Sequence, residues 1–263
     1  LVGQGVDVFN VTYTGAENAV GQFDATLSNV GIDKGIILST GSVLDHVVGG
    51  KKNGPVGPNN NNLSVTAWNT PGDVDLSAVI NEQTADAVVI EFDFIPQGDT
   101  IRFNYVFASE EYIEYDDPSS PFNDVFAFFI SGPGFASPTN IAILPGTTTP
   151  VSIKNVSRYS NTSFYRANGT GFTGPEFTDP TVVNFDGLTV QLTAVTKVTP
   201  CKVYHLKLAL ADGFDVNYDS GVFLQAGSLN SNPAFSFAID TTFTPLDTDT
   251  LMAEGCSNIK KCC

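Results

Sequence analysis

Six carboxylates crowd the sixteen-residue stretch Ser109–Asp124, which reads SEEYIEYDDPSSPFND. It separates two strand-like runs, and residues 103–153 contain no Lys, Arg or His. Like charges this close repel one another, which raises carboxyl pKa values and strains the fold. A divalent cation removes that penalty, and Ca²⁺ accepts six to eight oxygen ligands from irregular loops. The stretch therefore predicts a Ca²⁺ site, with a solvated acidic surface as the alternative.

The candidate ligands come from two acidic loops. The second loop, residues 211–221 (ADGFDVNYDSG), also separates two predicted strands, so the two loops can share one metal or hold one each. We expect Tyr112, Tyr115 and Phe122 to pack beneath the ligands. The predicted metal ligands are Glu110, Glu111, Asn123, Asp124, Asp212 and Asp219.

Composition restricts the possible partners. The 263 residues carry a formal net charge of −16 with only 12 Lys and Arg. Nucleic acids require basic patches, so this charge argues against nucleic-acid binding and favours metal cations. No run of about 20 apolar residues is present, so we expect no membrane insertion. A chain rich in Asn, Thr, Ser and Gly is typical of an extracellular protein.

Catalytic motifs are missing from the sequence. It contains no nucleophile elbow, phosphate loop or dinucleotide fingerprint, and His46 and His205 stand in unremarkable contexts. A pair of carboxylates is sufficient for a glycosidase, and Glu110 with Glu111 is the candidate pair. We predict that the protein is not an enzyme, with a glycoside hydrolase as an alternative.

Alternation of apolar and polar residues dominates the chain and predicts an all-β fold. Residues 87–96 and 100–109 alternate on either side of the turn PQGDT, which predicts a β-hairpin. Residues 124–132 are apolar on both faces and predict a strand buried on both sides. Further strands are expected at 188–198, 202–212, 220–229 and 234–243.

Helical signals are few. Residues 72–84 predict a short helix capped by Asp73 or Asp75, and residues 16–27 predict a second one. Long polar loops are expected at residues 49–62 and 158–180. Because strands with one apolar face bury it against another sheet, we predict a single two-sheet β-sandwich of jelly-roll type with one or two short helices.

Seven segments together resemble the choice-of-anchor L domain, a bacterial extracellular module. Glu110, Glu111 and Tyr112 match its Ser-Glu-Glu-Tyr motif, Asn123 and Asp124 match Phe-Asn-Asp, and Asp219 matches Asp-Ser-Gly. The resemblance covers residues 1–230 and implies display on a bacterial cell surface without an established enzymatic activity. The segments are residues 31–41, 71–80, 87–112, 122–134, 140–153, 185–212 and 219–228.

The C-terminal residues and the cysteines give further expectations. Residues 231–255 are expected to form a final strand and linker of the same unit, and residues 256–263 a tail that begins a next module. Relatives often carry a cysteine in the loop that here reads IEYDDPSSP, and this chain has none there. Cys201 is then either free or paired with Cys256.

Together these features predict a secreted, Ca²⁺-stabilised binding or adhesion module of a bacterial surface protein. Its expected partners are a surface glycan or protein ligand and the neighbouring modules of a longer protein. Trp68, Tyr159 and Tyr165 offer stacking faces for a glycan, with packing against the sheet as the alternative. A structural subunit or tip of a surface filament is the alternative function.

Overall fold

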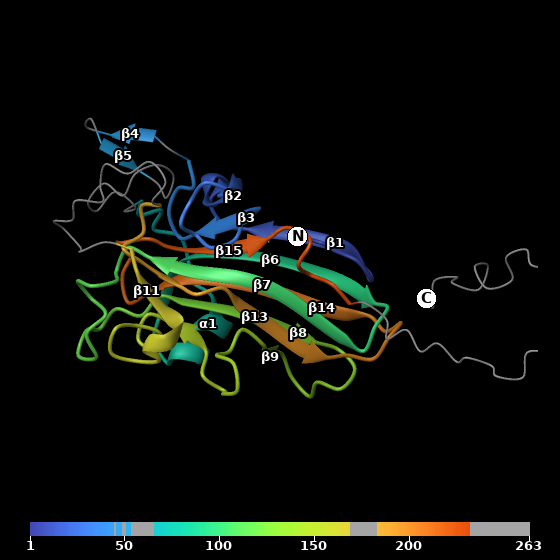
Figure 1. The fold of residues 1–263 in the computed structure, drawn as a ribbon. Coiled ribbons are helices and arrows are strands. Elements are labelled where there is room, and N and C mark those ends of the chain that lie inside the picture. Colours follow the sequence, from blue (N-terminus) through green and yellow to red (C-terminus); the bar gives the residue numbers. More distant parts are fainter. Residues whose placement is uncertain (45, 49–50, 54–65, 169–182, 232–263) are drawn as a thin grey trace, which may run out of the picture.

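A computed structural model describes residues 1–44, 46–48, 51–53, 66–168 and 183–231 (Figure 1). Several predictions lie outside these residues. They are the strand at 234–243, the unit boundaries within 231–255 and 256–263, most of the loop at 49–62 and the second half of the loop at 158–180.

Two antiparallel sheets pack face to face, which confirms the predicted β-sandwich. The first sheet has the order β1-β6-β14-β8-β10, with β9 also paired to β8. Its strands are β1 (Val6–Thr14), β6 (Thr84–Pro96), β8 (Val125–Ser131), β9 (Thr139–Asn140), β10 (Val151–Ser152) and β14 (Tyr204–Gly213).

The second sheet has the order β11-β12-β7-β15-β3-β2, with β13 also paired to β7. From β6 to β8 and again from β13 to β15, consecutive long strands alternate between the two sheets, as in a jelly roll. Its strands are β2 (Val20–Asp24), β3 (Lys34–Ser39), β7 (Thr100–Ser109), β11 (Tyr165–Ala167), β12 (Gly187–Thr189), β13 (Leu192–Lys197) and β15 (Ser220–Gln225).

Smaller elements lie outside the two sheets. Strands β4 (His46–Val48) and β5 (Lys51–Asn53) pair with each other, and the 3-10 helices are η1 (Glu17–Ala19) and η2 (Thr162–Phe164). Within the described residues the one α-helix is α1 (Val74–Ile80). No described helix has the length and apolar character needed to cross a membrane.

The predicted hairpin of residues 87–96 and 100–109 is wrong. β6 pairs with β1 and β14, whereas β7 pairs with β12, β13 and β15 in the other sheet. The turn between them therefore carries the chain from one sheet to the other. Both strands still point their apolar faces into one core, where Phe94 of β6 and Phe103 of β7 are buried. Alternation alone describes a buried face and does not distinguish a hairpin partner from a strand across the core.

The predicted helix at residues 16–27 is also wrong. Only the 3-10 turn η1 forms, and the chain continues as β2, which pairs with β3 from Val20↔Leu38 to Asp24↔Lys34. Phe23 then contacts Phe223 of β15 edge to face at 5.1 Å between ring centroids. Tertiary pairing and this aromatic contact outweigh a weak helical pattern that contains Gly21.

Strand β8 is buried on both faces, as predicted. Its inner residues Phe126, Phe128 and Ile130 belong to the core between the sheets. Its outer residues Val125, Ala127 and Phe129 are covered by α1, whose Leu76 is fully buried against them. The short helix therefore explains why both faces of this strand are apolar.

The side chain of Asp73 holds α1 in place from its N-terminus. Its Oδ1 accepts from the main-chain N–H groups of Asp75 (3.0 Å) and Leu76 (3.1 Å), and its Oδ2 lies 2.6 Å from Lys207 Nζ on β14. We expect Asp73→Ala to lower the free energy of unfolding by about 1–3 kcal/mol, because both the cap and a half-buried ion pair are lost.

The measurement is urea denaturation, with Asp75→Asn as the control. Asp75 also contacts Lys207, at 2.7 Å, but it leaves the cap intact and its side chain is 44% exposed. Equal losses for the two variants would contradict the capping role of Asp73.

A second charged group joins β6 and β14 on the outer face of the first sheet. His205 Nδ1 lies 2.9 Å from Asp93 Oδ1, and Nε2 lies 3.2 Å from Glu91 Oε1. Burial lowers the pKa of His205, but the hydrogen bonds and charges of Asp93 and Glu91 outweigh burial and raise it.

Because the pKa of His205 is higher in the folded state, its interactions stabilise the fold fully below pH 6.5, the ordinary histidine value. That contribution disappears as pH rises through the raised pKa. We expect the stability difference between wild type and His205→Gln to be largest below pH 6.5 and to shrink toward pH 9. Thermal melts across this range measure it, and a difference independent of pH would contradict the assignment.

Candidate functional site

Three segments meet at one end of the sandwich, the end toward which β7 runs and from which β15 starts (Figure 1). They are residues 110–124 after β7, residues 213–219 before β15 and the turn after β3. Pairing of Ser109 with Ser220 brings the first two together. All six predicted metal ligands lie here, and each is at most 7% exposed: Glu110, Glu111, Asn123, Asp124, Asp212 and Asp219.

Four of these carboxylates form one buried group, which we call the acidic cluster: Glu111, Asp124, Asp212 and Asp219. Their charges act on one another, since Asp124 raises the pKa of Glu111, and both Asp124 and Asp219 raise that of Asp212. Asp215, half-buried at the edge of the cluster, also raises the pKa of Glu111 and Asp124. The two acidic loops, far apart in sequence, therefore converge.

Asp124 ties the two loops together. Its Oδ1 accepts from the main-chain N–H of Gly213 at 2.9 Å, and its Oδ2 accepts from the hydroxyl of Ser220 at 2.6 Å. Burial nevertheless raises the pKa of Asp124 to about 8, because the two hydrogen bonds only partly offset the loss of water. This carboxylate is positioned rigidly and is still electrostatically costly.

Glu111 is the least satisfied member of the acidic cluster. It is 1% exposed, and neither of its carboxylate oxygens accepts a hydrogen bond from any described residue. Burial, followed by the charges of Asp124 and Asp215, raises its pKa well above the ordinary value, while Lys154 lowers it slightly. An ionised carboxylate buried in this way costs several kcal/mol unless it is protonated or meets a cation.

Asp212 is similar. It is 1% exposed and neither oxygen has a hydrogen-bonding donor with good geometry among the described residues, although the Thr40 hydroxyl is close enough to lower its pKa a little. Burial is the largest cause of its raised pKa, ahead of Asp124 and Asp219. Among the described residues, Glu111 and Asp212 thus present carboxylate oxygens with no hydrogen bond of good geometry.

Asp219 is held by the segment before α1 and by the turn after β3. Both of its carboxylate oxygens accept from the main-chain N–H of Thr66, at 3.1 and 3.0 Å. A Cβ atom on Gly41 would stand 1.7 Å from Asp219 Oδ2, so only glycine fits there. The Asp219 carboxylate can occupy this position because residue 41 has no side chain.

The remaining two predicted ligands, Asn123 and Glu110, make different contacts. The side-chain oxygen of Asn123 accepts from the main-chain N–H of Lys154 at 3.1 Å, so Asn123 joins its loop to the segment after β10. The Glu110 main-chain N–H donates to the Asp219 carbonyl at 3.0 Å. Burial raises the pKa of Tyr218, and the charge of the nearby Glu110 carboxylate adds a smaller contribution.

The side chains of the acidic cluster are not arranged as a ready-made metal site. Among the described residues, no three His, Cys, Asp or Glu side chains form a preformed metal-binding group. The donors are all oxygen atoms, which is the chemistry that Ca²⁺ prefers, and two of the carboxylates have no competing hydrogen bond. A cation here therefore requires the side chains of Glu111 and Asp212 to turn toward it.

Four aromatic side chains lie over the two loops and form what we call the aromatic collar: Tyr115, Phe122, Phe214 and Tyr218. Ring centroids are 5.0 Å apart for Tyr115 and Phe122, 5.0 Å for Tyr115 and Tyr218, and 5.6 Å for Phe122 and Phe214. The sequence predicted Tyr115 and Phe122 to pack beneath the ligands, whereas the structure places them in this partly exposed group. It gave no reason to choose Phe214 and Tyr218, which come from the other loop.

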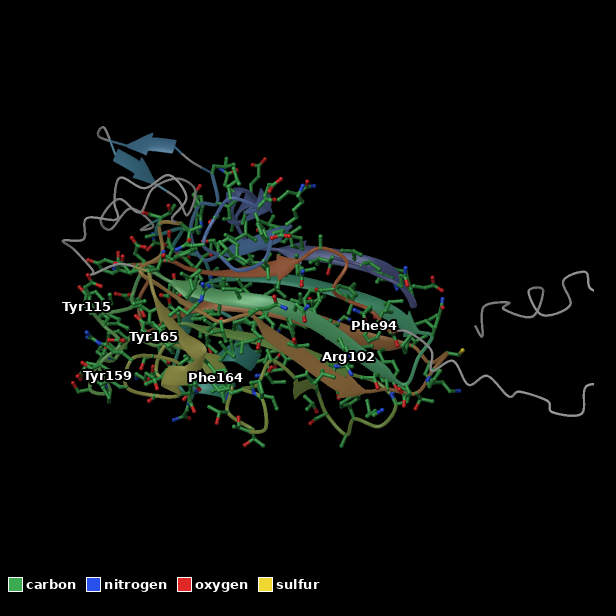
Figure 2. All side chains as sticks on the ribbon, viewed as in Figure 1. Phe94, Arg102, Tyr115, Tyr159, Phe164 and Tyr165 are labelled. Carbon is green, nitrogen blue, oxygen red and sulfur yellow. The ribbon has the colours of Figure 1, made fainter. Side chains whose placement is uncertain are left out.

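The predicted ligand-binding aromatics are arranged differently from one another, and Figure 2 labels two of them, Tyr159 and Tyr165. Tyr165 packs its ring against Tyr112 at 5.0 Å and contributes to the core. Trp68 is half-buried in a segment whose main chain is tied to Asp86. Tyr159 is 51% exposed, with the guanidinium of Arg158 4.9 Å from its ring centroid. Only Tyr159 presents the exposed face expected of a stacking residue.

Comparison with known families identifies the chain. Residues 1–230 match the family described as Choice-of-anchor L domain. The chain belongs to this family. Neither a search of curated proteins nor a search of solved structures found a match. A choice-of-anchor L domain is an extracellular or cell-surface module of a larger protein and is not a known class of enzyme.

One cysteine expectation is also settled for this choice-of-anchor L domain. Cys201 takes part in a disulfide bond, so it is not a free thiol. Its partner, predicted to be Cys256, lies outside the described residues. Cys201 itself has a φ of +60°, in the left-handed region.

The contact between Gly41 and Asp219 can be tested by adding one methyl group. We expect Gly41→Ala to destabilise the domain by about 1–3 kcal/mol or more, because the new Cβ overlaps a buried carboxylate held by Thr66. Chemical denaturation measures the loss.

Gly134→Ala is the matched control. Gly134 has a φ of +91° but no atom within 4 Å of an added Cβ, so that variant measures backbone strain alone. A smaller loss for Gly41→Ala than for Gly134→Ala would contradict tight packing of Asp219.

Proposed function

We propose that this choice-of-anchor L domain is a Ca²⁺-stabilised binding or adhesion module of a bacterial surface protein. One observation carries the proposal: Glu111 is buried with both carboxylate oxygens unsatisfied, beside the buried Asp124 and Asp212. The family places the module outside the cell. Extracellular Ca²⁺ sites typically have dissociation constants of about 10⁻⁴–10⁻³ M, so they need no high-affinity cage.

Two chemical routes relieve the buried charge, and they predict different behaviour. Protonation makes the carboxyls neutral, and the stability of the protein then does not depend on added cations. A divalent cation instead keeps them ionised, replaces mutual repulsion with attraction and links the segments that carry Glu111, Asp124 and Asp212. Among the described residues, Lys154 is the basic side chain that acts on Glu111. Its Nζ already donates to the Pro121 carbonyl and lies 3.6 Å from Glu82 Oε1. Because Lys154 is engaged in this way, we favour a bound cation as the source of positive charge.

The proposed cation is structural. Glu111, Asp124 and Asp212 are each at most 1% exposed, so a sugar hydroxyl cannot reach a cation held among them without displacing the loops. The cation would therefore not bind a glycan directly. Its effect on recognition would come through the shape of the loops, which a rigid sandwich presents at its end.

The alternative of a filament subunit has one supporting observation. Strand β1 is a sheet edge with Phe9, Val11 and Tyr13 exposed. Such an edge can pair with another chain. However, the register shifts between Phe9 and Thr12, and Asn10 has a φ of +53°, so the edge carries a bulge of the kind that discourages strand addition. We therefore keep the binding module as the proposal.

The hydrolase alternative receives no support from the site. Glu110 and Glu111 are each 1% exposed, whereas a catalytic carboxyl has to contact its substrate.

Thermal melts with EDTA and with excess Ca²⁺ test the proposal. We expect Ca²⁺ to raise the melting temperature, since a site occupied at a hundredfold excess over its dissociation constant adds about 2.7 kcal/mol of stability. Glu111→Gln and Asp212→Asn should lose this response. In EDTA both variants should be at least as stable as wild type, because each removes a buried charge.

Asp117→Asn is the control, since Asp117 is exposed and bonds only locally to Ser119. It should respond to Ca²⁺ like wild type. A wild-type melting temperature that neither EDTA nor Ca²⁺ changes would refute the cation and favour protonated carboxyls.

A further inference from the structure

The aromatic collar is built from the same two loops as the acidic cluster and is more exposed than it. Tyr115 and Phe122 belong to the loop that carries Glu111 and Asp124, and Phe214 belongs to the loop that follows Asp212. Whatever holds the carboxylates together therefore also holds the rings together. The collar depends on the spacing of the two loops.

Part of the collar is exposed to solvent and lies on strained backbone. Phe214 is 63% exposed and has a φ of +89°, Tyr218 has a φ of +57°, and Ile113 in the other loop has a φ of +76°. Left-handed backbone at bulky or β-branched residues is strained, and such residues concentrate at ligand sites. An exposed phenylalanine fixed by a strained backbone is a feature that stability alone does not favour.

The surroundings of the collar are negatively charged. Glu114 and Asp215 are half-buried beside it, and Asp117 is exposed on the same loop. Arg158 is engaged, because its Nε lies 3.0 Å from Asp116 Oδ1 and its terminal nitrogen donates to the Ile113 carbonyl at 2.6 Å. The collar therefore combines exposed aromatic surface with carboxylates and has no basic residue in its own loop.

We infer that the aromatic collar and its carboxylates bind a Lys- or Arg-bearing peptide segment of a protein partner. Ammonium and guanidinium groups interact with aromatic faces and pair with carboxylates, and the net charge of −16 attracts a basic partner over longer distances. The dependence of this binding on a cation rests on the proposed function, because the cation would set the spacing of the loops.

The ring geometry favours a peptide over a glycan. Interplanar angles within the collar are 76°, 50° and 81°, so the rings pack edge to face and tilted. They do not present a flat platform on which a sugar ring can stack. A side-chain cation needs only the face of one ring and a nearby carboxylate.

The test is fluorescence anisotropy with three labelled nine-residue peptides, in which Arg, Gln or Glu alternates with Gly. We expect the Arg peptide to bind, the Gln and Glu peptides not to bind, and added salt to weaken the complex. Phe214→Ala should weaken binding about tenfold, within the range of cation–π interactions, and Asp215→Asn should weaken it also. Circular dichroism and the thermal melt show whether each variant is folded.

Two controls separate the collar from general electrostatic attraction. Phe9→Ala removes a ring that is 37% exposed on β1, and Asp7→Asn removes an exposed charge from the same strand. Neither should change binding. Arg-peptide binding that Phe214→Ala leaves unchanged, or that Asp7→Asn reduces as much as Asp215→Asn does, would overturn the inference. So would binding of cello-, xylo- or chito-oligosaccharides in place of the Arg peptide.

The melts separate this inference from the proposed function. A Ca²⁺-dependent melting temperature without Arg-peptide binding overturns the collar inference and leaves the cation in place. Phe214-dependent peptide binding that is equal in EDTA and Ca²⁺, together with an unchanged melting temperature, refutes the cation and supports the collar. Both effects lost together in EDTA support both.

Discussion

Repulsion among buried carboxylates at one end of the sandwich is the constraint around which the structure is organised. Glu111, Asp124 and Asp212 come from both sides of the core and reach the same place with at most 1% of their surface exposed. Buried charges of one sign oppose folding unless protons or a cation neutralise them. A domain that maintains such a cluster in its interior keeps a strong dependence on whatever neutralises it.

The two-sheet frame makes this convergence possible. Strands β7 and β15 are neighbours and antiparallel, so the end of one and the start of the other coincide, and each leads directly into or out of an acidic loop. Strand β14 enters the second loop from the opposite sheet. Residues more than 80 positions apart, such as Asp124 and Gly213, are then within hydrogen-bonding distance. The cluster is a product of topology, because no single segment contains it.

The loops carry two layers with different chemistry. The inner layer consists of carboxylates that water does not reach, and the outer layer consists of the aromatic collar and the half-exposed acids beside it. Both layers are carried by the same two loops, so under the proposed function a cation that neutralises the inner charges would also set the shape of the outer surface. Strained residues such as Ile113 and Phe214 lie in this same region, which fits loops whose conformation is imposed by long-range contacts.

Local patterns in the sequence determined much of this domain. Alternation identified the strands and the faces that enter the core, Asp73 marked the start of α1, and the density of acids without basic residues pointed to the end of the sandwich where the candidate site lies. These features depend on neighbours in sequence, so they can be read without a structure. Alternation did not reveal that β6 and β7 lie in opposite sheets, and a weak helical pattern at residues 16–27 did not predict β2.

Tertiary structure decided which acids meet. In the sequence Glu110 and Glu111 were equal candidates, and the structure shows that the charges of Asp124 and Asp215 act on Glu111, whereas the charge of Glu110 acts on Tyr218. It also decided that Asn123 bonds to the main chain, that Gly41 makes room for Asp219, and that Phe214 and Tyr218 complete the collar. Each of these outcomes depends on the distance between segments remote in sequence, which is set by sheet pairing and packing and leaves no trace in local residue patterns.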